Sequence, residues 1–290
     1  MRVLLTGSAG RIGSLIHKKL SDYFDVIGLD IRPSSTTQVL GDIRNTKQLD
    51  KLVKDVDIIV HTAALHAPHV DIRSDDDFTS INVDATQRLA QLAITYQVKR
   101  FVFTSTTALY GHANQHPMHA CWIDETVPPR PKTIYHHTKY KAENILQSLS
   151  ERTGLPVSVI RMSRCFPEPA NLMALYRLYR GVDARDVADA HLQAIKTNLP
   201  EYEVFIVSGV TPFQYDDNFS LKRDPVEVLG HRAPELLLAY QQRNWRLPES
   251  IDRVYDSSKA QARLSWQPKY GFESVIKDFE RGSKEILPSE

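Results

Sequence analysis

The sequence predicts an α/β fold, a doubly wound parallel sheet with a small C-terminal lobe. Short apolar strands alternate with helical patterns through the first half of the chain, which is typical of a parallel sheet covered by helices on both faces. A glycine-rich turn, TGSAGRIG at residues 6–13, lies between the first strand and the first helix. Such a turn is typical of Rossmann-type sheets that bind dinucleotides.

The same pattern gives the order of the elements. In the first half we expect strands near 2–6, 24–30, 37–41, 57–61, 100–105 and 157–160, and helices near 11–21, 46–54, 75–97 and 134–152. In the second half we expect a strand at 203–208, a loop at 212–225 that could cover the site, and helices at 233–243, 257–265 and 272–282. We assign 1–165 and the returning elements at 181–208 to the Rossmann domain, and 166–180 and 209–290 to a substrate-binding lobe.

Composition narrows the function. The net charge of the 290 residues is +1 and 42% of them are hydrophobic, so there is no basic stripe for nucleic acid. No apolar run approaches the ~18 residues of a membrane span. Cys121 and Cys165 have neither a metal-binding spacing nor a disulfide framework. The N-terminus is expected to be the first strand rather than a signal peptide, and we expect a cytoplasmic protein.

Each glycine of the turn has a distinct task. Gly7 allows a sharp turn at the strand end, Gly10 allows the pyrophosphate to approach the backbone, and Gly13 allows the helix to pack closely on the sheet. A tight turn without a ligand would show the same three glycines. Asp30 favours the dinucleotide, because it ends the next strand, where a carboxylate accepts hydrogen bonds from the adenosine ribose.

Tyr135 and Lys139 are the catalytic candidates. They lie four residues apart and therefore share one face of the predicted helix. A free tyrosine titrates near pH ~10; the lysine ammonium and the positive ring of oxidised nicotinamide would lower this pKa and make the phenol a usable base. Taken alone, the spacing also fits an ordinary solvated helix face.

Taken together, these motifs resemble the extended short-chain dehydrogenase/reductase family, also called the NAD-dependent epimerase/dehydratase family. The resemblance rests on TGSAGRIG, Asp30, the Tyr135/Lys139 pair and the stretches Gly41-Asp42-Ile43, His61-Thr62-Ala63-Ala64 and Asn82-Val83, with Thr106 after the fifth strand. It implies that NAD is the cofactor and that its binding residues are Gly7, Ala9, Gly10, Arg11, Ile12, Gly13, Asp30, Asp42, Ile43, Thr62, Ala63, Ala64, Asn82, Thr104, Tyr135 and Lys139. We expect NAD rather than NADP because Asp30 would repel a 2′-phosphate, although Arg11 and Arg32 could swing toward one.

The resemblance also implies the third catalytic residue and part of the substrate site. Counting back from Tyr110-Gly111 places Thr106 at the family's catalytic Ser/Thr position, with Ser105 as its nearest rival. The expected substrate-binding residues are His66, Thr106, Thr107 and Arg164, and Arg73 is a second candidate for a carboxylate clamp. The histidines after the fourth and fifth strands lack a fixed ligand motif, so we expect them to hydrogen-bond substrate rather than to bind a metal.

Further comparison with the family limits the reactions that we expect of this chain. Thr107-Ala108 stands where sugar 4,6-dehydratases of the family carry an Asp-Glu pair, which argues against dehydration. RMSRCFPEP, residues 161–169, resembles the uronate dehydrogenases, and only seventeen residues, 168–184, separate it from the next family-like stretch. Nucleotide-sugar members are longer there. We therefore expect NAD-dependent oxidation of an alcohol on a small sugar or sugar acid, by a homodimer; nucleotide-sugar epimerisation is the alternative, and cofactor binding without turnover is a third.

Overall fold

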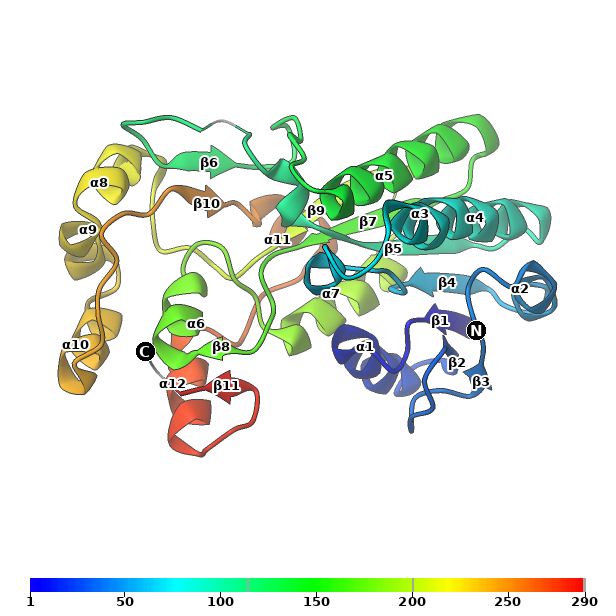
Figure 1. Ribbon diagram of the computed structural model, residues 1–290, viewed down its shortest axis with the longest axis horizontal. Helices are drawn as coiled ribbons and strands as arrows, with labels where there is room; N and C mark the ends of the chain where they lie inside the picture. Colours follow the sequence, from blue (N-terminus) through cyan, green and yellow to red (C-terminus); the bar gives the residue numbers. More distant parts are fainter. Residues whose placement is uncertain (114, 200, 289–290) are drawn as a thin grey trace.

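The central element is a seven-stranded, fully parallel sheet in the order β3-β2-β1-β4-β5-β7-β9 (Figure 1). The computed structural model describes residues 1–113, 115–199 and 201–288. The strands are β1 (Arg2–Thr6), β2 (Asp25–Asp30), β3 (Val39–Leu40), β4 (Ile58–His61), β5 (Arg100–Thr106), β7 (Val157–Met162) and β9 (Tyr202–Val207). The strand order reverses direction between β1 and β4, which is where open α/β sheets bind their ligands.

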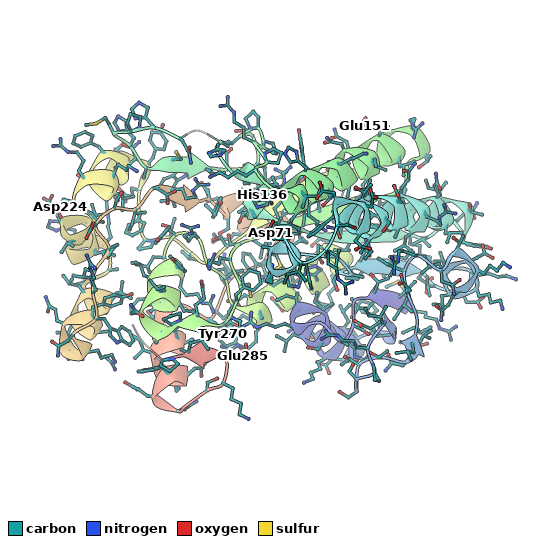
Figure 2. The ribbon with its side chains drawn as sticks, viewed as in Figure 1. Asp71, His136, Glu151, Asp224, Tyr270 and Glu285 are labelled. Carbon is teal, nitrogen blue, oxygen red and sulfur yellow. The ribbon has the colours of Figure 1, made fainter. Side chains whose placement is uncertain are left out.

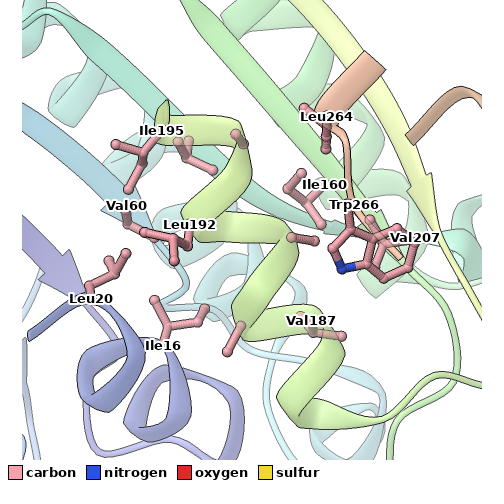
Figure 3. Close-up of a cluster of buried hydrophobic side chains, with 14 of the residues drawn as sticks. Ile16, Leu20, Val60, Ile160, Val187, Leu192, Ile195, Val207, Leu264 and Trp266 are labelled. Atoms are coloured by element: carbon pink, nitrogen blue, oxygen red, sulfur yellow. The ribbon is translucent and has the colours of Figure 1, made fainter. Parts of the chain in front are cut away.

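Helices cover both faces of the sheet, as the alternating pattern predicts. One face packs against α1 (Arg11–Ser21), α7 (Ala184–Lys196) and α11 (Ser258–Leu264). Figure 3 shows the core of this face, in which Ile16 and Leu20 of α1 meet Leu192 of α7, with Trp266 close by. The other face packs against α2 (Thr46–Val53), α4 (Ala85–Thr95) and α5 (Ile134–Thr153). Burial on both faces explains the apolar runs of the central strands.

The predicted helix at 75–97 is interrupted. It consists of α3 (Asp75–Thr79), a π-helical turn (Ser80–Asp84) and α4. The π turn carries Asn82, whose amide bonds to the loop after β4 and to α5. A π turn inserts one residue into a helix and is frequent at functional sites.

The small lobe has its own apolar core and lies at one end of the sheet (Figure 1). It contains α6 (Ala170–Tyr176), α8 (Asn218–Arg223), α9 (Pro225–Arg232), α10 (Pro234–Arg243) and α12 (Phe272–Glu280). Two small parallel sheets complete it: β6 (Cys121–Ile123) with β10 (Arg253–Tyr255), and β8 (Glu168–Pro169) with β11 (Ile286–Leu287).

One detail of the lobe differs from the prediction. The expected loop at 212–225 contains a 3₁₀ turn (Tyr215–Asp217) and α8, because Leu221 is buried in the lobe core. Strand β6 pairs with β10, and the predicted boundaries of the two domains stay a prediction. Among the described residues, no helix is both long enough and apolar enough to cross a membrane.

Candidate active site

The candidate active site lies at the carboxyl ends of the strands, where the sheet meets the small lobe. Figure 2 shows His136 at the end of α5 near the middle of the molecule and Glu151 at the far end. The Thr133 side chain accepts the backbone N–H of His136 and caps the helix. Tyr135 is therefore in the first turn of α5, where the helix dipole favours a negatively charged phenolate.

The turn between β1 and α1 has the shape that a dinucleotide requires. Gly7 has a φ of 75°, which a residue with a Cβ rarely adopts. A Cβ on Gly13 would lie 2.0 Å from the Gly7 carbonyl oxygen, whereas a Cβ on Gly10 would meet that oxygen at 3.2 Å and otherwise point into open space. In the part of the chain that the structure describes, no side chain caps α1. Its first N–H groups are thus available to a pyrophosphate, and the turn fits a dinucleotide.

Asp30 lies beside this turn, in the position expected for a ribose contact. One of its carboxylate oxygens accepts the Ala9 N–H at 2.9 Å, and the other accepts the Arg32 N–H at 2.9 Å. The Arg32 guanidinium Nε lies 4.0 Å from the same carboxylate. Both hydrogen bonds come from backbone groups, so the carboxylate is fixed at the edge of the cradle.

The predicted adenine contacts follow β3. The Arg44 guanidinium holds the pKa of the Asp42 carboxyl below its usual range, and one of its N–H groups donates to that carboxylate at 2.6 Å. Ile43 is buried in the core beneath. Contact of these two residues with adenine stays a prediction.

His61 locks together three parts of the cofactor region. It is 1% exposed at the end of β4, with Nδ1 at 2.6 Å from Thr6 Oγ1 and Nε2 at 2.9 Å from Thr86 Oγ1. The Thr86 hydroxyl donates to the Asn82 carbonyl, so it accepts from Nε2–H, and Nδ1 accepts from the Thr6 hydroxyl. Burial lowers the pKa of His61 to about 3, which keeps the ring neutral and this hydrogen-bond pattern fixed.

Two predicted cofactor residues hold the loop after β4. Asn82 accepts the Leu65 N–H at 2.8 Å and donates to the Leu65 carbonyl at 2.9 Å and to Thr138 Oγ1 at 3.1 Å. The Thr62 hydroxyl donates to the carbonyl at the end of β1 at 2.7 Å. These bonds place the backbone of Ala63 and Ala64 at the edge of the cradle, although their contact with a cofactor stays a prediction.

The Thr106 side chain lies close enough to the Tyr135 phenol to influence its pKa. Burial raises the pKa of Tyr135 to about 12, and the interaction with Thr106 opposes this rise. The chain by itself therefore does not show the predicted lowering by Lys139, because desolvation of the phenolate is the larger effect. The prediction also counted on the positive nicotinamide ring to lower the pKa of Tyr135, and that ring is part of the cofactor.

Lys139 lies one helical turn after Tyr135 and is 3% exposed. Its Nζ donates to the Thr104 carbonyl at 2.7 Å and lies 3.8 Å from the centre of the Phe103 ring. Burial lowers the pKa of Lys139 to about 7, and the Glu143 carboxylate opposes this. The charge of Lys139 near neutral pH thus depends on its neighbours.

Thr104 has both of its polar groups engaged by the chain. Its carbonyl accepts from Lys139, and its hydroxyl lies 2.7 Å from His191 Nε2. His191 Nδ1 donates to the Val187 carbonyl at 2.8 Å, so Nε2 accepts from the threonine. The structure shows Thr104 connecting α5 to α7 through β5, and its predicted contact with the cofactor stays untested.

The structure separates Thr106 from its rival Ser105. Neighbouring residues of a strand point to opposite faces. The Ser105 hydroxyl donates to the buried carboxylate of Glu143, whereas the Thr106 side chain opposes the rise in the pKa of Tyr135. Thr106 is therefore the residue of this pair that faces the candidate active site.

His66 and Phe166 bring two loops together beside the site. Their ring centres lie 6.2 Å apart, and the His66 ring also packs edge-on against His69 at 4.5 Å. His66 Nδ1 is buried and has no hydrogen-bond partner among the described residues. A buried ring nitrogen without a partner next to a partly exposed aromatic ring can bind a hydroxyl group of a substrate.

Two other predicted substrate residues are engaged elsewhere. The Arg164 guanidinium donates to Glu168 and lies over the Tyr176 ring at 5.5 Å. Thr107 is buried, and its carbonyl accepts the Tyr255 hydroxyl at 3.3 Å. Arg164 could bind a substrate carboxylate only by releasing Glu168. Its role as a carboxylate clamp stays a prediction.

Arg11 joins the cradle to the small lobe. Its guanidinium donates to the Cys165 carbonyl and pairs with Glu285 at 2.5 Å. Figure 2 labels Glu285 on the C-terminal segment, near Tyr270. The Arg11 side chain therefore points toward the lobe, and only its backbone lies in the glycine-rich turn.

The remaining histidines do not form a metal site in the described residues. His116 and His119 lie with ring centres 4.7 Å apart, and His112 Nδ1 is 3.1 Å from Gln115 Oε1. Within the described ranges, no group of three or more His, Cys, Asp or Glu side chains could hold a metal ion.

Comparison with known proteins assigns the family. A model of the NAD dependent epimerase/dehydratase family matches residues 3–171. The chain belongs to this family. The match confirms the predicted family. This family depends on NAD, which confirms the predicted cofactor.

Relatives within the family catalyse different reactions. The chain is 28% identical over 181 residues to a uronate dehydrogenase of Pseudomonas putida, an alignment that covers 60% of this chain and 65% of that enzyme. It is 31% identical over 320 residues to a UDP-glucose 4-epimerase of Halalkalibacterium halodurans, covering 93% of this chain and 91% of that enzyme. Alignments with the first three curated relatives span 56–65% of those relatives' lengths.

Solved structures confirm the fold. A short-chain dehydrogenase/reductase superfamily protein of Agrobacterium tumefaciens with bound NAD has a TM-score of 0.73 at 18% identity, covering 98% of this chain and 99% of that one. A UDP-glucose 4-epimerase of Thermotoga maritima with UDP-glucose has a TM-score of 0.69 at 21% identity, covering 97% and 99%. The chain thus has the Rossmann-type sheet of its family, and these comparisons leave its reaction open.

Sequence reasoning missed two groups of buried residues around the site. The first is His61, which lies in the stretch at 61–64. Only its neighbours Thr62, Ala63 and Ala64 were predicted to contact the cofactor. The second is the ion pair between Glu143 and Arg161. A signal for Glu143 was available, because it lies four residues after Lys139 and therefore on the same helix face.

Proposed function

We propose that this protein is an NAD-dependent dehydrogenase that oxidises an alcohol of a small sugar or sugar acid. The observation that carries the choice is the short connection between β7 and α7. It contains only β8, α6 and a loop, and its three arginines form ion pairs within the chain: Arg164 with Glu168, Arg177 with Asp183 and Arg180 with Asp252. A diphosphate needs several uncompensated donors, so this arrangement favours a small substrate over a nucleotide sugar.

The side chains present can move the proton of such an alcohol. Tyr135, as phenolate, takes the hydroxyl proton, while Thr106 hydrogen-bonds to the same oxygen and orients it. Lys139 as an ammonium stabilises the phenolate, and the first turn of α5 adds its positive dipole end. The glycine-rich turn and Asp30 would hold NAD, which would supply the hydride acceptor for this reaction when bound. The products are the carbonyl compound, NADH and one proton.

We assign substrate recognition to the loops that meet at His66 and Phe166. His66 Nδ1 lacks a partner among the described residues, and Phe166 offers a partly exposed apolar ring. Together they suit a sugar ring, which presents hydroxyl groups at its edge and C–H groups on its face. A carboxylate on the substrate would recruit Arg164 from Glu168.

An epimerase of nucleotide sugars is the second candidate. It is favoured by the relative from Halalkalibacterium halodurans, a UDP-glucose 4-epimerase whose alignment covers 93% of this chain. An epimerase would use the same Thr106, Tyr135 and Lys139 and would return the hydride to the other face of the sugar. It would also need a pocket for the nucleotide, which this chain would have to build from residues 212–245.

Calorimetry distinguishes the two functions. Purified protein saturated with NAD is titrated with UDP, with UDP-sugars, and with the matching free sugars and uronic acids. The dehydrogenase proposal predicts binding of a free sugar or sugar acid and no measurable binding of UDP. Tight binding of UDP alone would contradict it, because affinity for the bare nucleotide requires a dedicated pocket.

A further inference from the structure

A buried ion pair joins α5, the helix that carries Tyr135 and Lys139, to the neighbouring strand β7. Glu143 on α5 and Arg161 on β7 are 1% and 7% exposed, and their side chains meet at 2.6 Å. A second N–H of Arg161 donates to the same carboxylate at 3.1 Å, and the Ser105 hydroxyl donates to its other oxygen. Arg161 also donates to the Tyr110 hydroxyl at 2.8 Å. The charges and the hydrogen-bonding groups of the pair are thus compensated within the chain.

The free energy of folding does not by itself require this pair. Two charges lose their hydration when they are buried, and apolar residues of similar volume often give equal or greater stability. The surrounding core is apolar on both sides of the sheet, so such residues could be accommodated. The position of the pair therefore points to a task beyond packing.

Lys139 is the residue on which Glu143 acts. Tyr135, Lys139 and Glu143 follow one another at four-residue intervals along α5, and Glu143 opposes the loss of the proton from Lys139. The other ionisable neighbour that influences Lys139 is His61 of β4, which is neutral. Around Glu143 the other ionisable groups are Arg161, the buried phenol of Tyr110 in the segment after β5, and the partly buried phenol of Tyr202 in β9.

We propose that Glu143 is a positioning residue that keeps Lys139 a cation beneath the cofactor site, with Arg161 holding the carboxylate in place. This inference rests on the proposed function, in which Lys139 stabilises the Tyr135 phenolate. Without the negative charge of Glu143, Lys139 loses the carboxylate that opposes the loss of its proton, and it gives up that proton more readily. Tyr135 then loses the cation beside it, and its own proton is held more tightly.

The test measures the titration of Tyr135 in protein saturated with NAD and free of substrate. Ultraviolet difference titration against a Tyr135→Phe background isolates this phenolate from the other tyrosines. We expect Glu143→Gln, which keeps the size of the side chain, to raise the pKa of Tyr135 by about one unit. Glu151→Gln is the matched control, because it makes the same chemical change at an exposed position two turns further along α5, and it should leave the titration unchanged.

A double variant covers the case in which Glu143→Gln does not fold. Glu143→Leu combined with Arg161→Met removes both charges and restores apolar packing. We expect it to fold, and we expect the pKa of Tyr135 to be raised above that of the wild type, as in Glu143→Gln, since the carboxylate that favours the charged form of Lys139 is absent. A folded double variant with the wild-type titration, or a Glu143→Gln variant that titrates like the control, would show that the pair is only structural.

The readout also separates this inference from the proposed function. The titration needs no substrate, so it is informative even if no sugar is oxidised. If a substrate is found, the acid limb of the pH profile of kcat should move upward with the phenolate pKa in Glu143→Gln, while the dissociation constant of NAD stays within twofold of the wild type. If the pKa of Tyr135 shifts but the acid limb of the kcat profile does not move, Tyr135 is not the base. The role of Glu143 would be unaffected by that result.

Discussion

The cofactor region and the junction with the small lobe differ in how their buried polar groups are satisfied. Around the cradle, the side chains of His61 and Asn82 bond to fixed partners within the chain. At the junction, buried side-chain atoms of His66, Ser163 and Ser208 have no partner among the described residues. Buried polar groups are nearly always paired in folded proteins, so the junction is where a ligand or water completes the structure.

This difference assigns separate tasks to the two regions. The hydrogen bonds of the cofactor region are internal, so we expect it to be ordered before any ligand binds and to determine the chemistry. The junction has buried polar atoms without partners among the described residues, at the carboxyl ends of β7 and β9, and we expect it to determine which substrate is accepted. Substitutions should therefore separate into those that change catalysis and those that change substrate affinity.

The largest expected effect belongs to Tyr135→Phe. It removes the acid–base oxygen and should lower kcat by ~10³-fold, while the dissociation constant of NAD stays within twofold because the cradle is untouched. Tyr140→Phe, on the same helix, is the control and should keep normal turnover. NADH formation and cofactor fluorescence measure the two quantities, and near-normal turnover of Tyr135→Phe would refute its assignment as the base.

Lys139→Met should abolish most activity and also stabilise the fold. The pKa of Lys139 is lowered to about 7 in the folded state from about 10.4 in the unfolded state, so the unfolded chain binds more protons between these values. The wild-type free energy of unfolding should therefore rise with pH across this window, and the variant should lack that contribution. At pH 7 we expect the variant to be more stable by ~1–3 kcal/mol.

Urea unfolding at several pH values between 6 and 9 checks this expectation. Lys141→Met, at an exposed position of the same helix, is the control and should leave the pH dependence unchanged. A Lys139→Met variant with the wild-type slope would mean that Lys139 is not the group that titrates.

Two glycines of the cradle should give different defects. Gly13→Ala places a Cβ 2.0 Å from the Gly7 carbonyl oxygen and should cost ~1–3 kcal/mol of stability through overpacking. Gly10→Ala meets little protein, so it should leave the melting temperature nearly unchanged and weaken NAD binding by ~10-fold, since the new methyl group stands where the pyrophosphate approaches. Equal NAD affinity of Gly10→Ala and wild type would place the pyrophosphate elsewhere.

The smallest effects are expected at the junction. Ser163→Ala and Ser208→Ala remove hydroxyl groups that have no partner in the described chain, so neither should reduce stability. Each should raise the KM for the substrate by ~2- to 10-fold and leave NAD binding unchanged. A loss of NAD affinity instead would show that these hydroxyls belong to the cofactor region.

The cofactor half of the fold was predictable because its signals are local. Strand and helix periodicity, the glycine-rich turn and the four-residue spacing of Tyr135 and Lys139 all lie within short stretches of sequence. The choice between Ser105 and Thr106 was not local, because it depends on Glu143, which lies 38 residues away along the chain.

The small lobe was less predictable for a physical reason. Its pairings join distant short segments, such as Cys121–Ile123 with Arg253–Tyr255, and three-residue strands carry little periodicity. Residues 215–223 look like a loop because polar residues surround Leu221, yet the burial of that one side chain anchors α8. The ion pair between Arg164 and Glu168 also depends on how the chain turns after β7.

The most direct test of the proposed function is the fate of the hydride. Purified protein is supplied with excess NAD and a panel of aldoses, uronic acids and UDP-sugars, and NADH absorbance is followed over many turnovers. We predict sustained formation of NADH, one per molecule of substrate, with a free sugar or sugar acid. Interconversion of UDP-sugar epimers with no accumulation of NADH would contradict this function and establish the epimerase instead.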